Sequence, residues 1–258
     1  MKLNKRLLNL SEMVTSPYHL VWDCCCDHGL LGFKILADGL VKQVNFVDLV
    51  PAIIDKLDKK LSMYAYHLPN DVSWNTFCQD VASLQLMEDK HQSQLSPIPK
   101  QLVIISGVGG ELMIDMLEGL MQRYRGYNID YLLCPVQHTY KLRTALIKLN
   151  FKLKEERLVV ENKRGYELLL VNQVVGKEIS LSGKKIWEPK NSHKQYLVKL
   201  IAHYQRMESS DSSHKLSQLD QELNTKALMD YRLVLQEYYQ NTVESHWNVN
   251  EDKDESLF

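Results

Sequence analysis

A short acidic and cysteine-rich segment near the N-terminus carries the side chains best suited to chemistry. It reads VWDCCCDHGLLG over residues 21–32, so three adjacent cysteines stand between Asp23 and Asp27, and His28 follows. Zinc sites built from cysteine and histidine usually separate paired ligands by roughly two to four residues. Adjacent residues on a strand point to opposite faces and cannot converge on one ion. We therefore predict no metal site here and turn to the two carboxylates.

Composition and charge exclude some classes of protein. The 258 residues are 45% hydrophobic and 24% charged with a net charge of −1, so a nucleic-acid partner would have to bind a local basic surface. No apolar run approaches the roughly 20 residues that span a bilayer, and the basic N-terminus lacks the apolar core of a signal peptide. We therefore expect a cytoplasmic protein without a membrane partner. The five cysteines are an odd number, which argues against a disulfide framework.

Strand-like and helix-like segments alternate through the first part of the chain. The strand-like runs are short, apolar and rich in β-branched and aromatic residues, as strands buried on both faces should be. This alternation predicts an α/β fold with a mostly parallel sheet covered by helices on both faces. The predicted strands are 19–25, 43–50, 73–80, 101–108 and 131–136, and the predicted helices are 29–38, one starting after Pro51, one starting near Gly110, and 141–150.

The pattern changes after residue 150. Residues 151–173 predict two strands around a turn, a hairpin that would give the sheet an antiparallel edge. A linker at 174–192 precedes two amphipathic helices, with Leu197, Leu200, Tyr204 and Met207 on one apolar stripe and Leu216, Leu219, Leu223 and Ala227 on the other. We predict a Rossmann-like domain at 1–175, a helical, coiled-coil-like hairpin at 176–243 and a disordered acidic tail at 244–258.

Acidic or glycine-rich residues follow most of the predicted strands. In an open α/β sheet, ligands bind beyond the carboxyl ends of the strands, where the strand order reverses. Asp48 ends the second strand, about 20 residues after the first βα turn, which is the position that accepts hydrogen bonds from a ribose. Asp80 ends the third strand and could accept a hydrogen bond from an adenine amino group. The pattern favours a cofactor that contains adenosine.

The charge of the first loop separates two such cofactors. NAD needs a glycine-rich turn beside its pyrophosphate, but cysteines and a histidine occupy the glycine positions here. Asp23 and Asp27 would also repel a pyrophosphate. S-adenosylmethionine carries no phosphate, and its sulfonium and ammonium groups are both cationic. The loop therefore favours S-adenosylmethionine.

With these residues in place, the chain resembles the bacterial tRNA adenine-22 N1-methyltransferases, a class I S-adenosylmethionine-dependent family, from about Leu3 to about Gln240. Cys25 stands where the family has glycine in its first loop, and Cys134-Pro135-Val136 stands for the family's Q-P-N. The motifs that carry the resemblance are Leu3-Asn4-Lys5-Arg6-Leu7, Asp23 to His28, Ser106-Gly107-Val108-Gly109-Gly110, the altered Q-P-N with His138 and Arg143, and Gly165-Tyr166-Glu167-Leu168-Leu169.

The resemblance implies a Rossmann-like methyltransferase sheet and methyl transfer to N1 of an adenine in tRNA. The implied catalytic residues are Asp27, His28 and His138, and Gln137 and Tyr140 are further candidates for the substrate pocket. The implied cofactor-binding residues are Asp23, Cys24, Cys25, Cys26, Asp27, Gly29, Asp48, Leu49, Asp80, Val81, Ser106, Gly107, Val108 and Gly109.

Basic residues are candidates for contacts with tRNA phosphates. They include Lys5, Arg6, Arg123 and Arg125, together with Lys141, Arg143, Lys148, Lys152, Lys154, Arg157, Lys163 and Arg164. Two alternatives stay open: a catalytically weakened RNA-binding protein with a methyltransferase fold, and a methyltransferase with a different substrate. The sequence leaves the oligomeric state undetermined between a monomer and self-association through the helical hairpin.

Overall fold

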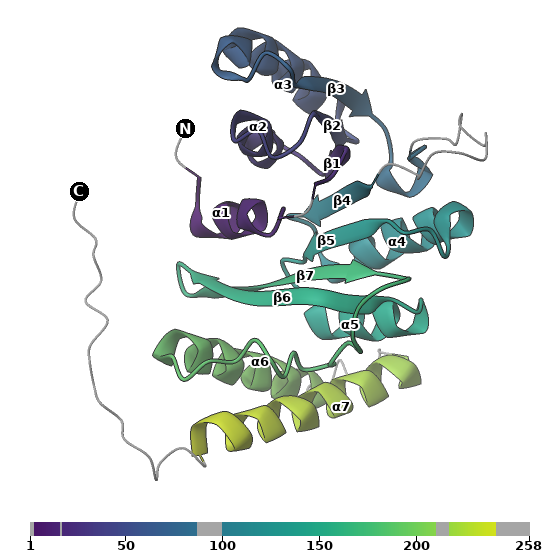
Figure 1. Ribbon diagram of the computed structural model, residues 1–258. Coiled ribbons are helices and arrows are strands. Elements are labelled where there is room, and N and C mark those ends of the chain that lie inside the picture. The colour runs from purple at the N-terminus through teal and green to yellow at the C-terminus, as the bar shows by residue number, and fades with distance from the viewer. Residues whose placement is uncertain (1–2, 16, 87–99, 210–216, 241–258) are drawn as a thin grey trace. The chain divides into compact units, whose positions relative to one another are not determined.

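The computed structural model describes residues 3–15, 17–86, 100–209 and 217–240 (Figure 1). The chain divides into two compact units, Met1–Ile186 and Trp187–Phe258. Among the described residues, no helix has the length and apolar character that a membrane span requires. The predicted acidic tail at 244–258 lies outside the described residues.

The first unit is built on one seven-stranded sheet in the order β3-β2-β1-β4-β5-β7-β6 (Figure 1). Strands β1 to β5 pair in parallel, whereas β7 runs antiparallel to both β5 and β6. The predicted parallel sheet with a terminal antiparallel hairpin is thus confirmed. The strands are β1 (Leu20–Cys24), β2 (Gln43–Asp48), β3 (Ser73–Cys78), β4 (Gln101–Ser106), β5 (Asp130–Cys134), β6 (Lys152–Glu161) and β7 (Arg164–Asn172).

Burial along the strands explains why the sequence forms this sheet. Every residue of β1, β4 and β5 is buried, as expected of central strands with a helix layer on each face. Val21 and Phe46 pack with helices α1 and α2 on one face, and Trp22 packs with helices α4 and α5 on the other. The helices are α1 (Lys5–Glu12), α2 (Leu30–Ala37), α3 (Pro51–Tyr64), α4 (Gly110–Tyr124) and α5 (Thr139–Lys148).

The strand order reverses between β1 and β4, which pair with each other and are followed by α2 and α4 on opposite faces. Loops leaving the carboxyl ends of these two strands therefore diverge and leave room between them. The β1–α2 loop and the β4–α4 loop are the two segments that the sequence pattern singled out. The topology thus places both at the switch point of the sheet.

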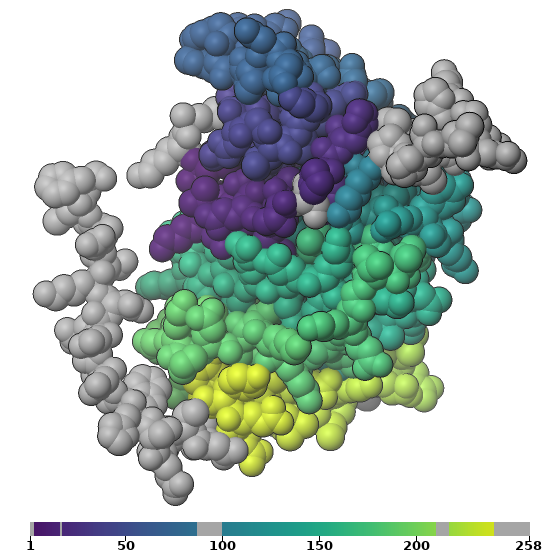
Figure 2. All heavy atoms as spheres, in the orientation of Figure 1, coloured from purple at the N-terminus to yellow at the C-terminus, as the bar shows by residue number. Residues whose placement is uncertain are grey.

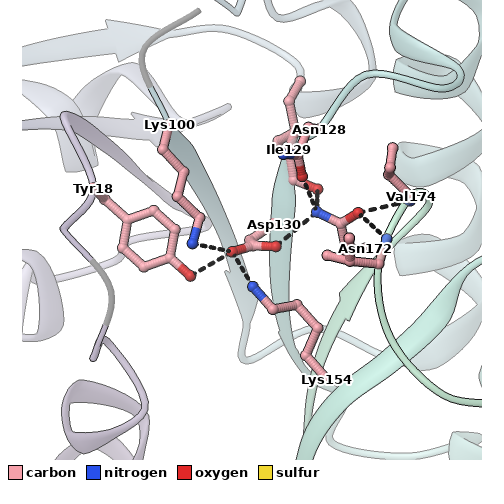
Figure 3. A network of polar contacts seen from close by, with 9 residues as sticks. Tyr18, Lys100, Asn128, Ile129, Asp130, Lys154, Asn172 and Val174 are labelled. Atoms are coloured by element: carbon pink, nitrogen blue, oxygen red, sulfur yellow. Dashed lines mark hydrogen bonds and ion pairs between the residues drawn. The ribbon is translucent and has the colours of Figure 1, made fainter. Parts of the chain in front are cut away.

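A network of hydrogen bonds surrounds a buried carboxylate at the amino-terminal ends of the parallel strands, away from the switch point (Figure 3). Asp130, at the start of β5, is 0% exposed and accepts hydrogen bonds from Tyr18, Lys154 and Asn172, each over 2.7 Å. Burial alone would raise the pKa of Asp130, but the hydrogen bonds from these three residues outweigh it and hold the pKa below its usual value. Lys154 is therefore a structural partner of Asp130 at the amino-terminal ends of the parallel strands, away from the switch point, and its contact with RNA stays a prediction.

Replacing Asp130 with asparagine should destabilise the fold at neutral pH by about 1.5–3 kcal/mol, the usual range for a hydrogen bond to a charged group. Because the folded-state pKa is lowered, the carboxylate contributes this stability above its unfolded pKa of about 3.9 and loses it as the pH falls through the folded value. Urea unfolding of both proteins from pH 7 to pH 3 measures the difference. A gap that is equally large at pH 7 and pH 3 would contradict the account.

The segment from residue 176 to Ile186, expected in the second domain, belongs to the first compact unit. Lys177 pairs with Leu153 of β6 through two backbone hydrogen bonds, and Ser180 O accepts a hydrogen bond from Arg143 over 2.9 Å. Gly183 lies so close that an added Cβ would be 2.8 Å from Nη2 of Arg143. These contacts hold the segment onto the sheet domain.

The second unit contains helix α6 (Asn191–Ser209) and helix α7 (Gln218–Leu235), which is followed by a short π-helical turn at Gln236–Gln240. The predicted helical hairpin is confirmed, but the apolar stripes were partly wrong. On α6, Ile201 is buried and Leu200 is only half-buried, while on α7 Leu219 is exposed. Leu197 and Ala227 are buried as predicted, and Tyr204 and Tyr231 add a stacked aromatic pair between the two helices. Leu216 lies outside the described residues.

Candidate active site at the switch point

A cavity of about 470 Å³ lies beyond the carboxyl ends of β1 and β4. Five parts of the first unit line it: the end of β1 with the β1–α2 loop and the first turn of α2, helix α1 with its N-terminal flank, the end of β4 with the loop after it, the loop after β5, and the start of β7. Its lining residues are Asn4, Arg6, Leu7, Asp23, Cys25, Cys26, Asp27, His28, Leu30, Leu31, Ser106, Gly107, Val136, Arg164 and Tyr166. The cavity therefore brings the acidic loop and two arginines into one site.

The β1–α2 loop turns sharply through left-handed backbone conformations. Cys25, Asp27 and Gly29 have φ values of 57°, 46° and 63°. The loop is closed by backbone hydrogen bonds from Cys26 N–H to Val47 O over 3.2 Å and from Gly29 N–H to Cys26 O over 2.7 Å. A side chain at positive φ is strained, so Cys25 occupies a position where glycine fits better. The observed conformation therefore agrees with the glycine that the sequence resemblance implies at this position.

Cys25→Gly should therefore leave the free energy of unfolding within about 1 kcal/mol of the wild type. Relief of the left-handed strain, about 1–2 kcal/mol, offsets the extra chain entropy of glycine, about 0.5–1 kcal/mol, and the loss of a half-buried thiol. The matched control is Cys24→Gly, at a fully buried position in β1, which should cost more because a core side chain is lost from a strand. Thermal or urea unfolding compares them, and equal losses would contradict the assignment of Cys25 to a glycine position.

Asp23 is buried at the end of β1 and caps the start of α2. Its Oδ2 accepts a hydrogen bond from Gly32 N–H over 2.9 Å, and only 2% of the residue is exposed. Burial raises the pKa of Asp23 to about 7, although the Gly32 hydrogen bond works in the opposite direction. A cation in the cavity would favour the charged form of this carboxyl. Asp23 is thus suited to a positively charged ligand group.

The carboxylates at the ends of β1, β2 and β3 converge around Cys25. Burial, together with the negative charges of Asp48, Asp23 and Asp80, raises the pKa of the Cys25 thiol to about 12. The thiol is therefore protonated at neutral pH and is a poor nucleophile or metal ligand. Burial also raises the pKa of Cys26 and Cys24, so the cysteines of the loop act as small packing groups.

Asp48 and Asp80 lie beside the cavity rather than in its lining. Asp48 accepts backbone hydrogen bonds from Val50 over 3.1 Å and from Asp27 over 3.4 Å, which fix its side chain beside the first loop. Asp80 caps the short helix Val81–Ser83 by accepting a hydrogen bond from Ala82 N–H over 2.9 Å. A carboxylate has roughly four acceptor positions, so Asp48 keeps positions for a ribose. Leu49 is exposed, whereas Val81 is buried in the core.

The loop from Ser106 to Gly110 shows two different uses of glycine. Gly107 has a φ of 86° and lines the cavity, and a Cβ added there would meet nothing within 4 Å. Gly110 N–H donates to Gln137 O over 2.9 Å, and a Cβ added at Gly110 would come within 2.6 Å of His138 O. Gly110 thus permits the β4 and β5 loops to pack together. Gly107, in contrast, leaves open space for a ligand.

The predicted catalytic residues fall in two places. Asp27 and His28 line the cavity, are 68% and 75% exposed, and approach each other to 3.5 Å. His138 is the N-cap of α5 with a φ of 58° and lies 3.4 Å from Glu111, and it is not among the lining residues. Tyr140 is buried in the core, so its predicted place in a substrate pocket is wrong.

Val108 and Gly109, predicted to bind the cofactor, are also absent from the cavity lining. Val108 packs partly into the core, and Gly109 is the N-cap of α4. Gly29 lines a second cavity of about 420 Å³ between α2 and α3, which His28 separates from the first. The β1–α2 loop thus contributes lining residues to both cavities.

Arg6 and Arg164 were predicted from the sequence as candidate contacts with tRNA phosphates but not as residues of the cofactor cavity, and Tyr166 was not predicted in a site. All three line the cavity. The available signal was the N-terminal motif that contains Arg6 and the hairpin motif that contains Tyr166. Arg143 was predicted as a candidate for RNA contact, but it is 0% exposed and pairs with Glu156 and Glu167 over 2.8 Å. That prediction is wrong.

Comparisons with known proteins agree with this geometry. A family model described as "Methyltransferase domain" matches residues 3–169. The chain is similar in structure to the B. subtilis m1A22 tRNA methyltransferase TrmK, with 19% identity, coverage of 92% of this chain and 98% of that one, and a TM-score of 0.65. It is also similar to M. capricolum TrmK in complex with S-adenosyl-homocysteine, with 13% identity, coverage of 90% and 97%, and a TM-score of 0.65. No curated protein matches the sequence.

Proposed function

The chain belongs to the methyltransferase-domain family, and from this premise we propose that it transfers a methyl group from S-adenosylmethionine to N1 of an adenine in tRNA. The observation that carries the proposal is the cavity at the switch point, with Asp23 and Asp27 on one wall and Arg6 and Arg164 on another. Acidic groups suit a cationic methyl donor, and basic groups suit a nucleic acid.

The residues around the cavity fit this cofactor. Asp23 and Asp27 offer negative charge to the sulfonium and ammonium groups, and Asp48 offers acceptor positions to the ribose. The open space at Gly107 allows a ligand to approach the backbone. S-adenosylmethionine supplies an electrophilic methyl group when it is bound. We propose that Asp23, Asp27, Asp48, Asp80 and Gly107 hold it, beside Cys25.

The substrate chemistry requires little acid–base assistance from the protein. Adenine N1 has a lone pair at neutral pH, so no strong base is needed for it to attack a methyl group. Holding the base in line can contribute up to about 7–11 kcal/mol in favourable cases. N1 lies on the Watson–Crick edge, so the base must be unpaired or extruded. We propose that Asp27 and His28, both exposed in the cavity, orient the base rather than transfer protons.

Two findings support tRNA as the substrate. Both structural neighbours named above are described as TrmK proteins, one of them as an m1A22 tRNA methyltransferase, and they match this chain over nearly their whole length. Two arginines, Arg6 and Arg164, also line the cavity.

The test is incubation of the purified protein with S-adenosylmethionine and unmodified tRNA, followed by mass spectrometry of the nucleosides. We expect 1-methyladenosine to appear, and mapping of the modified position identifies the target nucleotide. Methylation of another nucleoside would favour a methyltransferase with a different substrate. Cofactor and RNA binding without methylation would favour the catalytically weakened RNA-binding protein.

A further inference from the structure

We propose that Arg6, Tyr166 and Arg164 form a phosphate-binding wall that holds the RNA backbone next to the target base. This inference rests on the proposed function and deepens it, because it assigns the contact with substrate to particular side chains. The three residues come from α1 and β7, and all three line the switch-point cavity. We call them the basic wall.

The basic wall is built into the fold. The guanidinium carbon of Arg6 lies 5.2 Å from the centroid of the Tyr166 ring, a cation–π arrangement that fixes the orientation of the Arg6 side chain. Helix α1 is fastened to the hairpin at both ends: Lys5 N–H donates to Glu161 over 2.8 Å, and Arg157 pairs with Glu12 over 3.3 Å. In Figure 2 the purple N-terminal helix lies directly on the green hairpin. The wall is therefore preorganised.

The two arginines have charge available for a ligand. Within the described part of the chain, neither Arg6 nor Arg164 forms an ion pair with a carboxylate. Glu161 lies opposite Arg164 in the strand pairing, but its Oε1 accepts the Lys5 backbone N–H. Arginines without carboxylate partners in a cavity are suited to an anion, and the planar guanidinium group matches phosphate geometry.

The wall and the proposed adenosine contacts lie on opposite sides of the switch point. The proposed adenosine contacts lie on one side of the switch point, where Asp48 ends β2 and Asp80 follows β3. Arg164 and Tyr166 belong to β7, beyond β4 and β5 on the other side. Arg164 is exposed at the hairpin end, where a macromolecule can reach it. Two guanidinium groups exceed what a single cofactor carboxylate needs.

The test uses the full-length variants Arg6→Gln and Arg164→Gln, with Lys42→Gln as the control. Lys42 is not among the predicted phosphate contacts, its side chain is 65% exposed, and it directly precedes β2, so the control removes one positive charge at the amino-terminal end of the sheet. Filter binding to tRNA is measured over a series of salt concentrations, and calorimetry measures S-adenosylmethionine binding. We expect each cavity variant to weaken tRNA binding about tenfold at low salt and to reduce the salt slope by about 0.7–0.9, the loss of one phosphate contact. S-adenosylmethionine affinity should stay within about twofold.

Two results would overturn the wall while leaving the proposed function intact. One is weaker S-adenosylmethionine binding with unchanged tRNA binding, which would assign the arginines to the cofactor carboxylate. The other is tRNA binding by both cavity variants equal to that of the control. Arg6→Lys separates charge from packing, because it should restore part of the tRNA affinity if Arg6 binds phosphate. A wild-type protein that binds S-adenosylmethionine but no tRNA would instead overturn the proposed substrate, and the wall with it.

Discussion

Replacing Arg143 with alanine is expected to lower the free energy of unfolding by about 3–5 kcal/mol, the range for removing one partner from a buried ion pair. The Arg143 side chain is 0% exposed, and its guanidinium group contacts Glu156, Glu167 and Ser180 O over 2.8–2.9 Å. Without it, the buried carboxylates of Glu156 and Glu167 lose their ion pairs with Arg143. The segment 176–186 also loses its central contact with the sheet domain.

Urea unfolding followed by circular dichroism measures this loss. The matched control is Arg157→Ala, because Arg157 also pairs with two glutamates but its side chain is 32% exposed. Partly exposed ion pairs contribute about 0–1 kcal/mol, so the control should unfold almost like the wild type. Equal losses in both variants would show that Arg143 is not the buried centre of the cluster.

Replacing Asp48 with alanine should weaken S-adenosylmethionine binding about 10- to 100-fold. Hydrogen bonds to a charged group contribute about 1.5–3 kcal/mol, and each 1.4 kcal/mol corresponds to a factor of ten. Asp48 ends β2, contacts the first loop through Asp27 N–H over 3.4 Å, and is only partly buried. The variant should therefore fold nearly as well as the wild type, because no core side chain is lost.

Calorimetric titration measures the affinity, and Asp71→Ala is the control. Asp71 precedes β3 at the opposite edge of the sheet, and its side chain is 63% exposed. It should have no effect on cofactor binding. Unchanged affinity in Asp48→Ala would remove Asp48 from the cofactor site.

The sequence predicted the sheet well because the buried strands leave a direct pattern. Predicted and observed strands start within about one residue of each other, but four of the five predictions ran about two residues too far. Those extra residues, such as Leu49 and Gly107, lie in the loops that follow the strands at the site. The buried faces of the helices in the second unit were harder to predict, because exposed leucines such as Leu219 follow helical spacing as closely as the buried residues do.

The candidate site could be predicted only where its residues are neighbours in sequence or follow a strand. Asp23, Asp27 and His28 met that condition and lie together in the cavity. The basic wall did not, because Arg6 and Tyr166 are brought together by the docking of α1 on the hairpin. Arg143 was wrongly predicted to contact RNA because nothing in its local sequence distinguishes a buried arginine from an exposed one.

The central claim is that the altered β1–α2 loop, with Cys25 in the place of glycine, is a working cofactor site. Calorimetric titration of the wild-type protein with S-adenosylmethionine tests it most directly, with ATP as the comparison ligand because it shares the adenosine but carries phosphates. We predict saturable binding of one S-adenosylmethionine per chain and much weaker binding of ATP, because Asp23 and Asp27, which line the cavity at the proposed cofactor position, repel the triphosphate of ATP. A folded protein that shows no binding of S-adenosylmethionine, or that prefers ATP, would contradict the account.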